Sequence, residues 1–212
     1  MFSFDNPYDQ SSFINFLEAE FLPEDFRERQ EELDLDVGQR IQNVRQIGKV
    51  PSLDDLTVYE IHHESEHDPR VTLTRESFKL LKQYGVKNAL AAFVSENSDN
   101  YRFSLITSSL NLTEEGQAKR EFSNPRRYSF LLGPEAKVKT PEMYLRQKGR
   151  VTGLKDLQDR FDVKVLTKKF YNEISNWYFW ALENVKFPED AEAQSGGRNM
   201  AVIRMITRLV FI

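Results

Sequence analysis

The sequence contains no cysteine among its 212 residues. This absence excludes a disulfide framework and any metal site built from thiolates. Long apolar runs are also missing, since no segment approaches the roughly 18 apolar residues that a membrane span requires. The N-terminal segment MFSFDNPYDQ lacks the basic start and apolar core of a secretory signal. We therefore expect a cytoplasmic protein that has no membrane partner.

Several common catalytic and cofactor motifs are absent as well. The sequence holds no G-x-x-x-x-G-K-[ST] phosphate loop, no G-x-G-x-x-G dinucleotide motif and no G-x-S-x-G nucleophile motif. It also lacks the Asn-Pro-Pro-Tyr motif of amino-methyltransferases. We therefore expect no nucleotide-phosphate loop, no serine-hydrolase site and no S-adenosylmethionine site within this chain.

Charge is distributed unevenly, although the net charge is only −4. Residues 1–37 contain eleven Asp and Glu against two Arg, whereas residues 119–150 contain nine Lys and Arg against three Glu. Because phosphate contacts are local, a mildly acidic protein with a basic segment can still bind a polyanion. The alternative is that both segments form ordinary solvated surface.

The hydrophobic pattern predicts an α/β fold, with a mixed central β-sheet of about four to six strands flanked by helices. Helices are expected at 13–17, 26–33, 74–84, 154–161 and 167–185, and strands at 41–47, 56–61, 88–94, 101–106 and 127–132. The domain organisation predicted from this order is an α/β domain over residues 1–140 and a mostly helical part over residues 141–212.

The C-terminal segment from Met200 to Ile212 is strongly apolar, has helical periodicity and ends without a polar cap. We expect the natural protein to continue beyond this helix, so that the chain is a fragment. The apolar face between Val202 and Phe211 is expected to need a partner. That partner is the helix around Trp177, a second copy of the chain, or a following domain.

The three histidines fall within one short segment, at positions 62, 63 and 67, among several carboxylates. Histidine and carboxylate side chains can bind zinc or another divalent ion. Their spacing matches no established metal motif, and adjacent strand residues point to opposite faces. A solvated loop between a strand and a helix is the favoured interpretation.

Asp55, Glu60 and His62 form the candidate catalytic group. Metal-dependent nucleases gather carboxylates around Mg²⁺. The restriction-endonuclease core places an Asp at the start of one strand and Glu-x-Lys on the next, and Glu60-Ile-His62 fits the second element with His in place of Lys. No Asp or Glu occurs in residues 37–53, so Asp55 is the candidate partner. This predicts Asp55 and Glu60 as Mg²⁺ ligands; the alternative is that both are surface acids.

Basic residues that could contact DNA occur in the second half of the chain. The stretch 119–128 interleaves cations with Phe122 and Tyr128. Arginine forks bind phosphates, and aromatic rings stack on exposed bases. The alternative is that the arginines simply flank a packed strand. The candidate DNA-binding residues are Lys119, Arg120, Arg126, Arg127, Lys137 and Lys139.

Ten short segments occur in an order that is typical of one family: Val58–Ile61, Asp68–Val71, Ala89–Phe93, Tyr101–Ile106, Lys119–Phe122, Arg126–Gly133, Leu154–Leu157, Phe161–Val163, Thr167–Tyr171 and Arg208–Ile212. The series resembles the N-terminal region of the single-chain type IIG restriction enzymes, which carry their own DNA-adenine methyltransferase. The resemblance spans most of the chain after residue 40.

The resemblance implies a restriction-endonuclease-like core that acts as the endonuclease-like, DNA-handling domain of a bacterial type II restriction–modification enzyme. Its partners are then double-stranded DNA and the methyltransferase domain of the full-length protein, which binds S-adenosylmethionine outside this chain. Residues 141–212 become a helical connector to that domain.

Glu60 matches the Glu of the family's core, whereas His62 takes the lysine position and the first Asp has no convincing counterpart. This departure leaves two alternatives to a Mg²⁺-dependent endonuclease. One is a catalytically inactive DNA-binding or scaffolding module, and the other is a protein-interaction domain.

Overall fold

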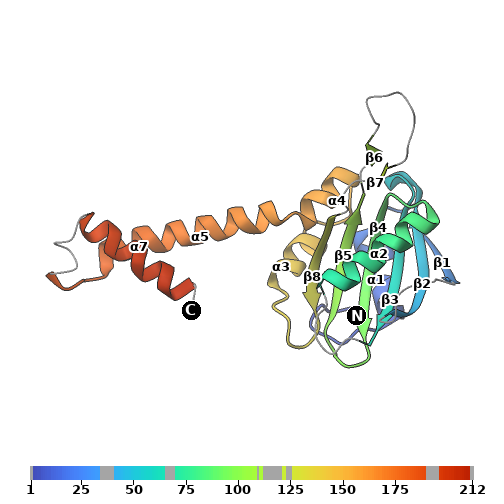
Figure 1. Ribbon diagram of the computed structural model, residues 1–212, viewed down its shortest axis with the longest axis horizontal. Helices are drawn as coiled ribbons and strands as arrows, with labels where there is room; N and C mark the ends of the chain where they lie inside the picture. The colour runs from blue at the N-terminus through green and yellow to red at the C-terminus, as the bar shows by residue number, and fades with distance from the viewer. Residues whose placement is uncertain are drawn as a thin grey trace. The chain divides into compact units, whose positions relative to one another are not determined.

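The computed structural model describes residues 2–33, 41–64, 70–108, 110–111, 121–122, 126–189 and 196–210. The chain forms two compact units, Met1–Phe161 and Asp162–Ile212. The first contains a six-stranded mixed sheet with flanking helices and the second is helical, which confirms the predicted α/β class (Figure 1). Among the described residues, no helix combines the length with the apolar character that a membrane crossing demands.

The sheet has the spatial order β1 (Arg27–Glu32), β2 (Ile41–Val50), β3 (Leu56–His63), β4 (Asn88–Ser95), β5 (Tyr101–Thr107) and β8 (Arg126–Leu132). Neighbouring strands are antiparallel except β3 and β4, which run parallel. A parallel pair needs a crossover connection, and helix α2 (Arg70–Tyr84) supplies it. Five of these strands lie where apolar runs predict them.

Strand β1 corrects one sequence prediction. The charge-rich pattern of residues 26–33 predicts a helix, but the structure has an edge strand there, and all six of its residues are exposed. An edge strand without a buried face needs no apolar alternation, so the sequence carried no strand signal. Phe26, just before β1, packs so closely on Gly48 of β2 that a Cβ at Gly48 would lie 2.3 Å from its ring.

Helix α2 packs on one face of the sheet. Leu73, Leu80 and Leu81 point toward the sheet and form a buried cluster with side chains of β2, β3, β4 and β5. Gly85 has a φ of +66°, a conformation that suits glycine and ends the helix where the sequence predicts. The α2 face is therefore held by aliphatic packing.

The opposite face is covered by helix α1 (Gln10–Phe16), by the π-helix η1 (Leu17–Phe21) and by helix α4 (Leu154–Phe161). The side chain of Asp9 caps α1 by accepting a hydrogen bond from the N–H of Ser12. The ring of Phe103 on β5 lies 5.2 Å from Phe13, 5.8 Å from Phe21 and 5.4 Å from Phe161, measured between ring centroids. Aromatic packing therefore joins these elements to the sheet.

Arg160 explains why the first unit extends to Phe161, whereas the sequence places a boundary after residue 140. Its side chain is 2% exposed and donates to Asp156 at 2.7 Å. It also donates to the carbonyls of Gly149 at 2.6 Å and Arg150 at 3.0 Å. These bonds hold the segment before α4 against the sheet domain.

The remaining short elements are η2 (Pro51–Leu53), β6 (Leu110–Asn111), β7 (Glu121–Phe122), α3 (Lys139–Pro141) and the π-helix η3 (Glu142–Gln147).

Arg146 fixes the N-terminal segment on the same face. Its guanidinium donates to Glu20 at 2.7 Å and to the carbonyl of Phe2 at 2.8 Å. It also lies 4.9 Å from the centre of the Phe4 ring. The N–H of Gly133, just after β8, donates to the carbonyl of Phe4 at 2.8 Å. The first residues of the chain are therefore bound to its later part.

The second unit pairs helix α5 (Val163–Asn184) with helix α7 (Gly197–Val210), which runs back along α5 (Figure 1). Val202 and Ile206 of α7 form a small buried cluster with Ala181 of α5. This confirms the helix around Trp177 as one of the partners expected for the C-terminal apolar segment. Phe211 and Ile212 lie outside the described residues.

Candidate functional site

Glu60 is a buried carboxylate in the interior of the sheet, with a side chain that is 3% exposed. Side chains alternate along a strand. Tyr59 and Ile61 belong to the cluster under α2, so Glu60 points to the α1 face. Strands β3 and β4 run in parallel toward the end where His62 lies. Ligands of open α/β sheets bind at the carboxyl ends of the strands, which makes this end the first candidate site.

Three side chains hold the carboxylate of Glu60. The hydroxyl of Tyr8 donates to Oε2 at 2.6 Å, and the side-chain amide of Gln10 donates to the same oxygen at 2.9 Å. Nε2 of His62 lies 2.8 Å from Oε1. Both carboxylate oxygens are thus engaged by the protein, and the N-terminal segment is joined to β3. We call these four residues the Glu60 network.

The Glu60 network keeps this carboxyl group ionised. Burial raises the pKa of Glu60, but the hydrogen bonds from His62, Tyr8 and Gln10 outweigh it and hold the pKa below its ordinary value. Burial, together with the adjacent Glu60, raises the pKa of Tyr8 well above its usual range. Tyr8 therefore stays protonated and donates a hydrogen bond, and the ionised Glu60 accepts it at neutral pH.

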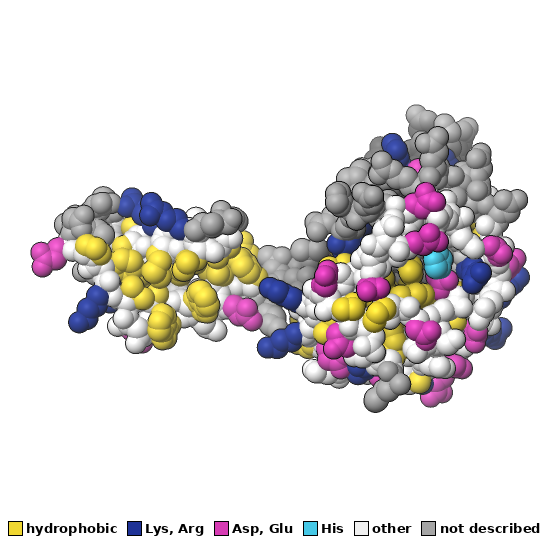
Figure 2. All heavy atoms as spheres, turned by 90° about the horizontal axis from the view of Figure 1, so that it is seen from below, with side chains coloured by type: hydrophobic (Ala, Val, Ile, Leu, Met, Phe, Trp, Pro, Cys, Tyr) yellow, Lys and Arg dark blue, Asp and Glu magenta, His cyan; other side chains and the backbone are white. Residues whose placement is uncertain are grey.

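Strand β2 adds polar groups on the same face. Its register places Arg45 opposite Glu60 and Asn43 opposite His62, and paired residues of antiparallel strands share a face. Asn43 donates to Glu32 of β1 at 2.7 Å. Figure 2 shows a histidine side chain on the visible surface, with both acidic side chains and Lys or Arg side chains around it. Because Arg45 lies on this face together with Glu32 and Glu60, the face carries charges of both signs.

Asp55 does not meet Glu60. Asp55 lies before β3, and Glu60 lies four residues beyond Leu56, the first residue of that strand, which is about 13 Å along it. Two carboxylates share one ion only when their oxygens approach within about 4–5 Å. Among the described residues, no group of three or more His, Cys, Asp or Glu side chains could hold a metal ion. In this arrangement, Asp55 and Glu60 do not fit as joint ligands of Mg²⁺.

The histidines are placed differently from the sequence interpretation. His62 and His63 belong to β3 rather than to a loop. Successive strand residues point to opposite faces, as the sequence argument requires, and only His62 joins the Glu60 network. His67 lies outside the described residues.

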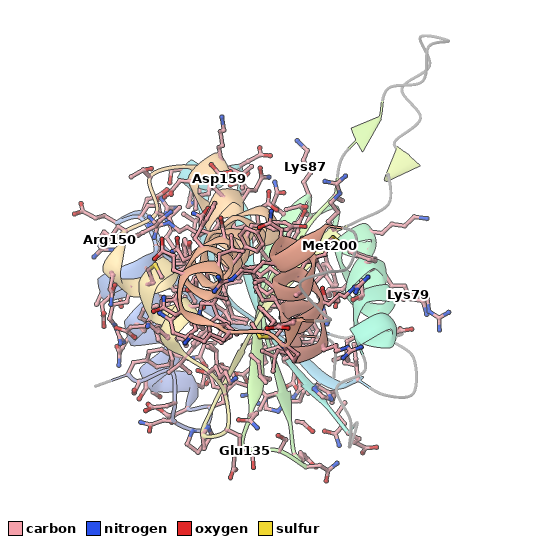
Figure 3. The ribbon with its side chains drawn as sticks, turned by 90° about the vertical axis from the view of Figure 1, so that its left-hand side faces the viewer. Lys79, Lys87, Glu135, Arg150, Asp159 and Met200 are labelled. Carbon is pink, nitrogen blue, oxygen red and sulfur yellow. The ribbon has the colours of Figure 1, made fainter. Side chains whose placement is uncertain are left out.

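A second candidate site lies on the α2 side of the sheet. The exposed side of α2 carries Arg75, Lys79 and Lys82, spaced by four and three residues, so that they form one stripe. Lys79 lies at the surface of the helix (Figure 3), and its ammonium group is 3.3 Å from the carboxylate of Glu76. The single acid of α2, Glu76, is 4% exposed. The outer surface of α2 therefore carries three cations, and one of them, Lys79, is paired with Glu76.

Two arginines extend this cationic surface onto the sheet. Arg102 of β5 pairs with Phe93, and Arg127 of β8 pairs with Ile106. Both partners belong to the cluster under α2, so both arginines lie on that face. The guanidinium of Arg127 is 4.9 Å from the centre of the Phe93 ring. Stacking on a ring orients the planar fork, which suits bidentate phosphate contacts. We call Arg75, Lys79, Lys82, Arg102 and Arg127 the basic face.

The predicted DNA-binding residues are divided between the two ends of β8. Arg126 and Arg127 begin the strand, whereas the exposed Lys137 and Lys139 follow its end. The seven residues of β8 span about 20 Å, so the two pairs do not form one patch. Figure 3 shows Glu135, just before the lysine pair, at the lower end of the sheet. The predicted residues Lys119 and Arg120 lie outside the described residues.

Sequence reasoning missed half of the Glu60 network and most of the basic face. Tyr8 and Gln10 lie 52 and 50 residues from Glu60, and no local pattern links them. Arg102 belongs to a segment whose alternating pattern predicts only a strand, so nothing in the sequence marked it as a binding residue. The cations of α2 had a usable signal, because their spacing puts them opposite the apolar side of a helix that the sequence predicts.

Comparisons with protein-family models, curated proteins and solved structures found no match to this chain. The resemblance to type IIG restriction enzymes therefore stays a prediction. The function has to be argued from the Glu60 network and the basic face.

Proposed function

We propose that this chain is a DNA-handling domain that holds duplex DNA by its phosphates on the basic face and does not cut it at Glu60. Of the functions that the sequence predicts, this is the inactive DNA-binding module of a restriction–modification enzyme, with duplex DNA and a methyltransferase domain as partners. The observation that carries the proposal is that Arg102 and Arg127 lie on the face of the sheet that carries α2, whose exposed side bears Arg75, Lys79 and Lys82.

The chemistry of the basic face fits a polyanion. Its five cations come from one helix and two strands, so their relative positions are fixed by the sheet core. Each lysine or arginine that contacts a phosphate releases counterions from the DNA, which favours binding at low salt. Such contacts position a duplex without reading its sequence. The basic face therefore supports holding DNA rather than recognising a base sequence.

The Glu60 network supports holding rather than cutting. Mg²⁺ in nuclease sites is bound through one or two carboxylates and water in near-octahedral geometry. Glu60 already accepts hydrogen bonds from Tyr8 and Gln10 and contacts His62. The network is suited to fixing the N-terminal segment on the sheet.

The salt dependence of DNA binding tests the proposal. Fluorescence anisotropy with a labelled duplex, over a series of KCl concentrations, gives the slope of log affinity against log salt. Replacing Arg102 and Arg127 with Ala should flatten the slope by about two units, because each lost phosphate contact removes about 0.9. The matched control replaces Lys137 and Lys139 with Ala, which removes the same charge at the other end of β8 and should leave the slope unchanged.

Two outcomes contradict the proposal. An equal loss in both double variants moves the DNA contact away from the basic face. No binding by the wild-type chain at low salt removes DNA handling altogether.

A Mg²⁺-dependent endonuclease is the second candidate, favoured by the lowered pKa of Glu60 at the carboxyl end of the parallel strands. Metal binding there requires the donors to move aside and a second carboxylate to approach. Nicking of supercoiled plasmid in MgCl₂ tests this for the wild type and for Glu60→Gln. We expect nicking by neither; nicking that Glu60→Gln abolishes would make the chain an active nuclease.

A further inference from the structure

Helix α5 carries an exposed stripe of aromatic side chains. Phe170, Trp177 and Trp180 are 46%, 61% and 62% exposed. Together with Glu173, they are spaced by three, four and three residues, which places them on one side of the helix. We call these four residues the aromatic stripe. Three large rings so close together on a helix surface mark an interface rather than ordinary solvated surface.

A neighbouring stripe of α5 is already used within the unit. Ile174, Tyr178 and Ala181 pack with Val202 and Ile206 of α7. Helix α5 therefore has two adjacent apolar stripes, and the hairpin covers one of them. A helix that is apolar on more than one side is normally covered on each of those sides. Figure 2 shows hydrophobic side chains gathered over this hairpin.

Helix α7 continues the surface on the same side of the hairpin. Residues advance by about 100° along a helix, and α7 runs antiparallel to α5. Ala201, Met205 and Arg208 then lie on the side of α7 that adjoins the aromatic stripe, next to the buried stripe that contains Val202 and Ile206. The surface is therefore two helices wide, with aromatic rings on one helix and smaller side chains on the other.

We propose that this surface is a self-association site, on which a second copy of the chain docks to form a four-helix bundle. A two-fold axis along the hairpin places α5 of one copy on α7 of the other, so that rings meet smaller side chains. The proposal is independent of DNA binding by the basic face.

Charge favours this arrangement. From Phe170 to its end, α5 has two acids, Glu173 and Glu183, and no Lys or Arg, whereas α7 has three Arg and no acid. Docking α5 on α5, or α7 on α7, sets like charges against each other. Docking α5 on α7 sets unlike charges together, with Glu173 of one copy and Arg208 of the other at the same end of the bundle.

The available area is also of the right order. Aromatic side chains bury about 150–250 Å² each, so three rings with roughly half of their surface free contribute about 300 Å² per copy. Dimers of ordinary size bury about 800 Å² per partner. The rings therefore supply more than a third of that area, and the remaining surface of two paired helices can supply the rest.

Tryptophan fluorescence gives a direct test, because the chain has two tryptophans and both belong to the aromatic stripe. Sedimentation velocity of the full chain from about 1 to about 100 µM brackets the affinity of a modest interface. We expect a monomer–dimer equilibrium, in which tryptophan emission moves to shorter wavelength and acrylamide quenching falls at least twofold as dimer forms.

Charge reversal tests the pairing itself. Glu173→Arg and Arg208→Glu should each weaken the dimer about tenfold, and the two together should restore it. Leu131→Lys, at a site that is 41% exposed on the first unit, is the matched surface control and should change nothing. Far-UV circular dichroism checks that each variant keeps its helices.

Three results overturn the proposal. The first is a chain that stays monomeric with solvent-exposed tryptophans at the highest concentration, which leaves the surface to another protein. The second is a dimer whose tryptophan quenching equals that of the monomer. The third is a doubly reversed variant that is no tighter than either single variant.

Discussion

The two faces of the sheet differ in the charged side chains that they carry and in how far these are buried. On the α1 face, the carboxylate of Glu60 is almost fully buried and held by Tyr8, Gln10 and His62. On the α2 face, Arg102 and Arg127 lie half-buried along the sheet beside α2. A buried charge is stable only with fixed partners, whereas a half-buried cation keeps part of its surface accessible to a phosphate. The first face is therefore suited to stability and the second to binding.

Removing the buried carboxylate should give the largest effect. Glu60→Ala leaves the donors of Tyr8 and Gln10 without their acceptor, which should lower the free energy of unfolding by about 2–4 kcal/mol. The matched control is Glu64→Ala, an exposed acid directly after the same strand, with an expected change below about 0.5 kcal/mol. Urea denaturation followed by far-UV circular dichroism measures both, because tryptophan emission reports only on the second unit.

Equal losses in Glu60→Ala and Glu64→Ala would break the comparison between the faces. The carboxylate of Glu60 would then contribute no more than an ordinary surface acid does.

Acid should remove part of the same stabilisation. The folded-state pKa of Glu60 lies below its ordinary value, so the unfolded chain binds this proton more readily. The resulting stability is complete above the unfolded value of about 4.3 and is lost as the pH falls through the folded pKa. The difference in Tm between the wild type and Glu60→Gln should therefore shrink between pH 6 and about pH 3.

The pKa of Asp156 is also lowered. Burial raises this pKa, but the hydrogen bond from Arg160 and other contacts outweigh that effect. Its contribution is common to the wild type and Glu60→Gln and cancels in their difference. A Tm difference that is constant over this pH range would show that Glu60 is not ionised by its network.

The smallest folding effect is expected on the other face. Arg127→Ala removes the contact with the Phe93 ring, which is worth about 0.5–1 kcal/mol at such sites. The same variant should flatten the salt dependence of DNA binding by about one unit. Arg126→Ala is the control, because Arg126 adjoins Arg127 on β8 but lies outside the basic face. A loss of several kcal/mol in Arg127→Ala would make Arg127 a structural residue.

The sheet was predictable where the chain is buried. Runs such as Ala89–Phe93 have apolar residues on both faces, and that pattern locates β4 without any knowledge of its neighbours. Strand β1 is the counterexample, because all six of its residues are exposed and none packs into the core. Burial imposes a sequence pattern, and an edge strand without burial imposes none.

The candidate sites were less predictable than the fold. Glu60 and His62 lie two residues apart on one face of a strand that the sequence predicts, and the structure brings their side chains together. Their other partners, Tyr8 and Gln10, come from a segment that tertiary packing alone brings there. Asp55 is the opposite case. It is close to Glu60 in sequence, but the extended strand between them keeps the two side chains apart in space.

The bonds of Arg146 also have a consequence for the order of biosynthesis. Arg146 is made 126 residues after Glu20 and 144 residues after Phe2, its two partners in the N-terminal segment. Domains begin to fold from the N-terminus during synthesis. Here the first residues cannot form these bonds until almost the last residues of their unit have been made. A ribosome that stalls before Arg146 therefore displays the phenylalanines of the N-terminal segment without this anchor, as a surface that chaperones can bind.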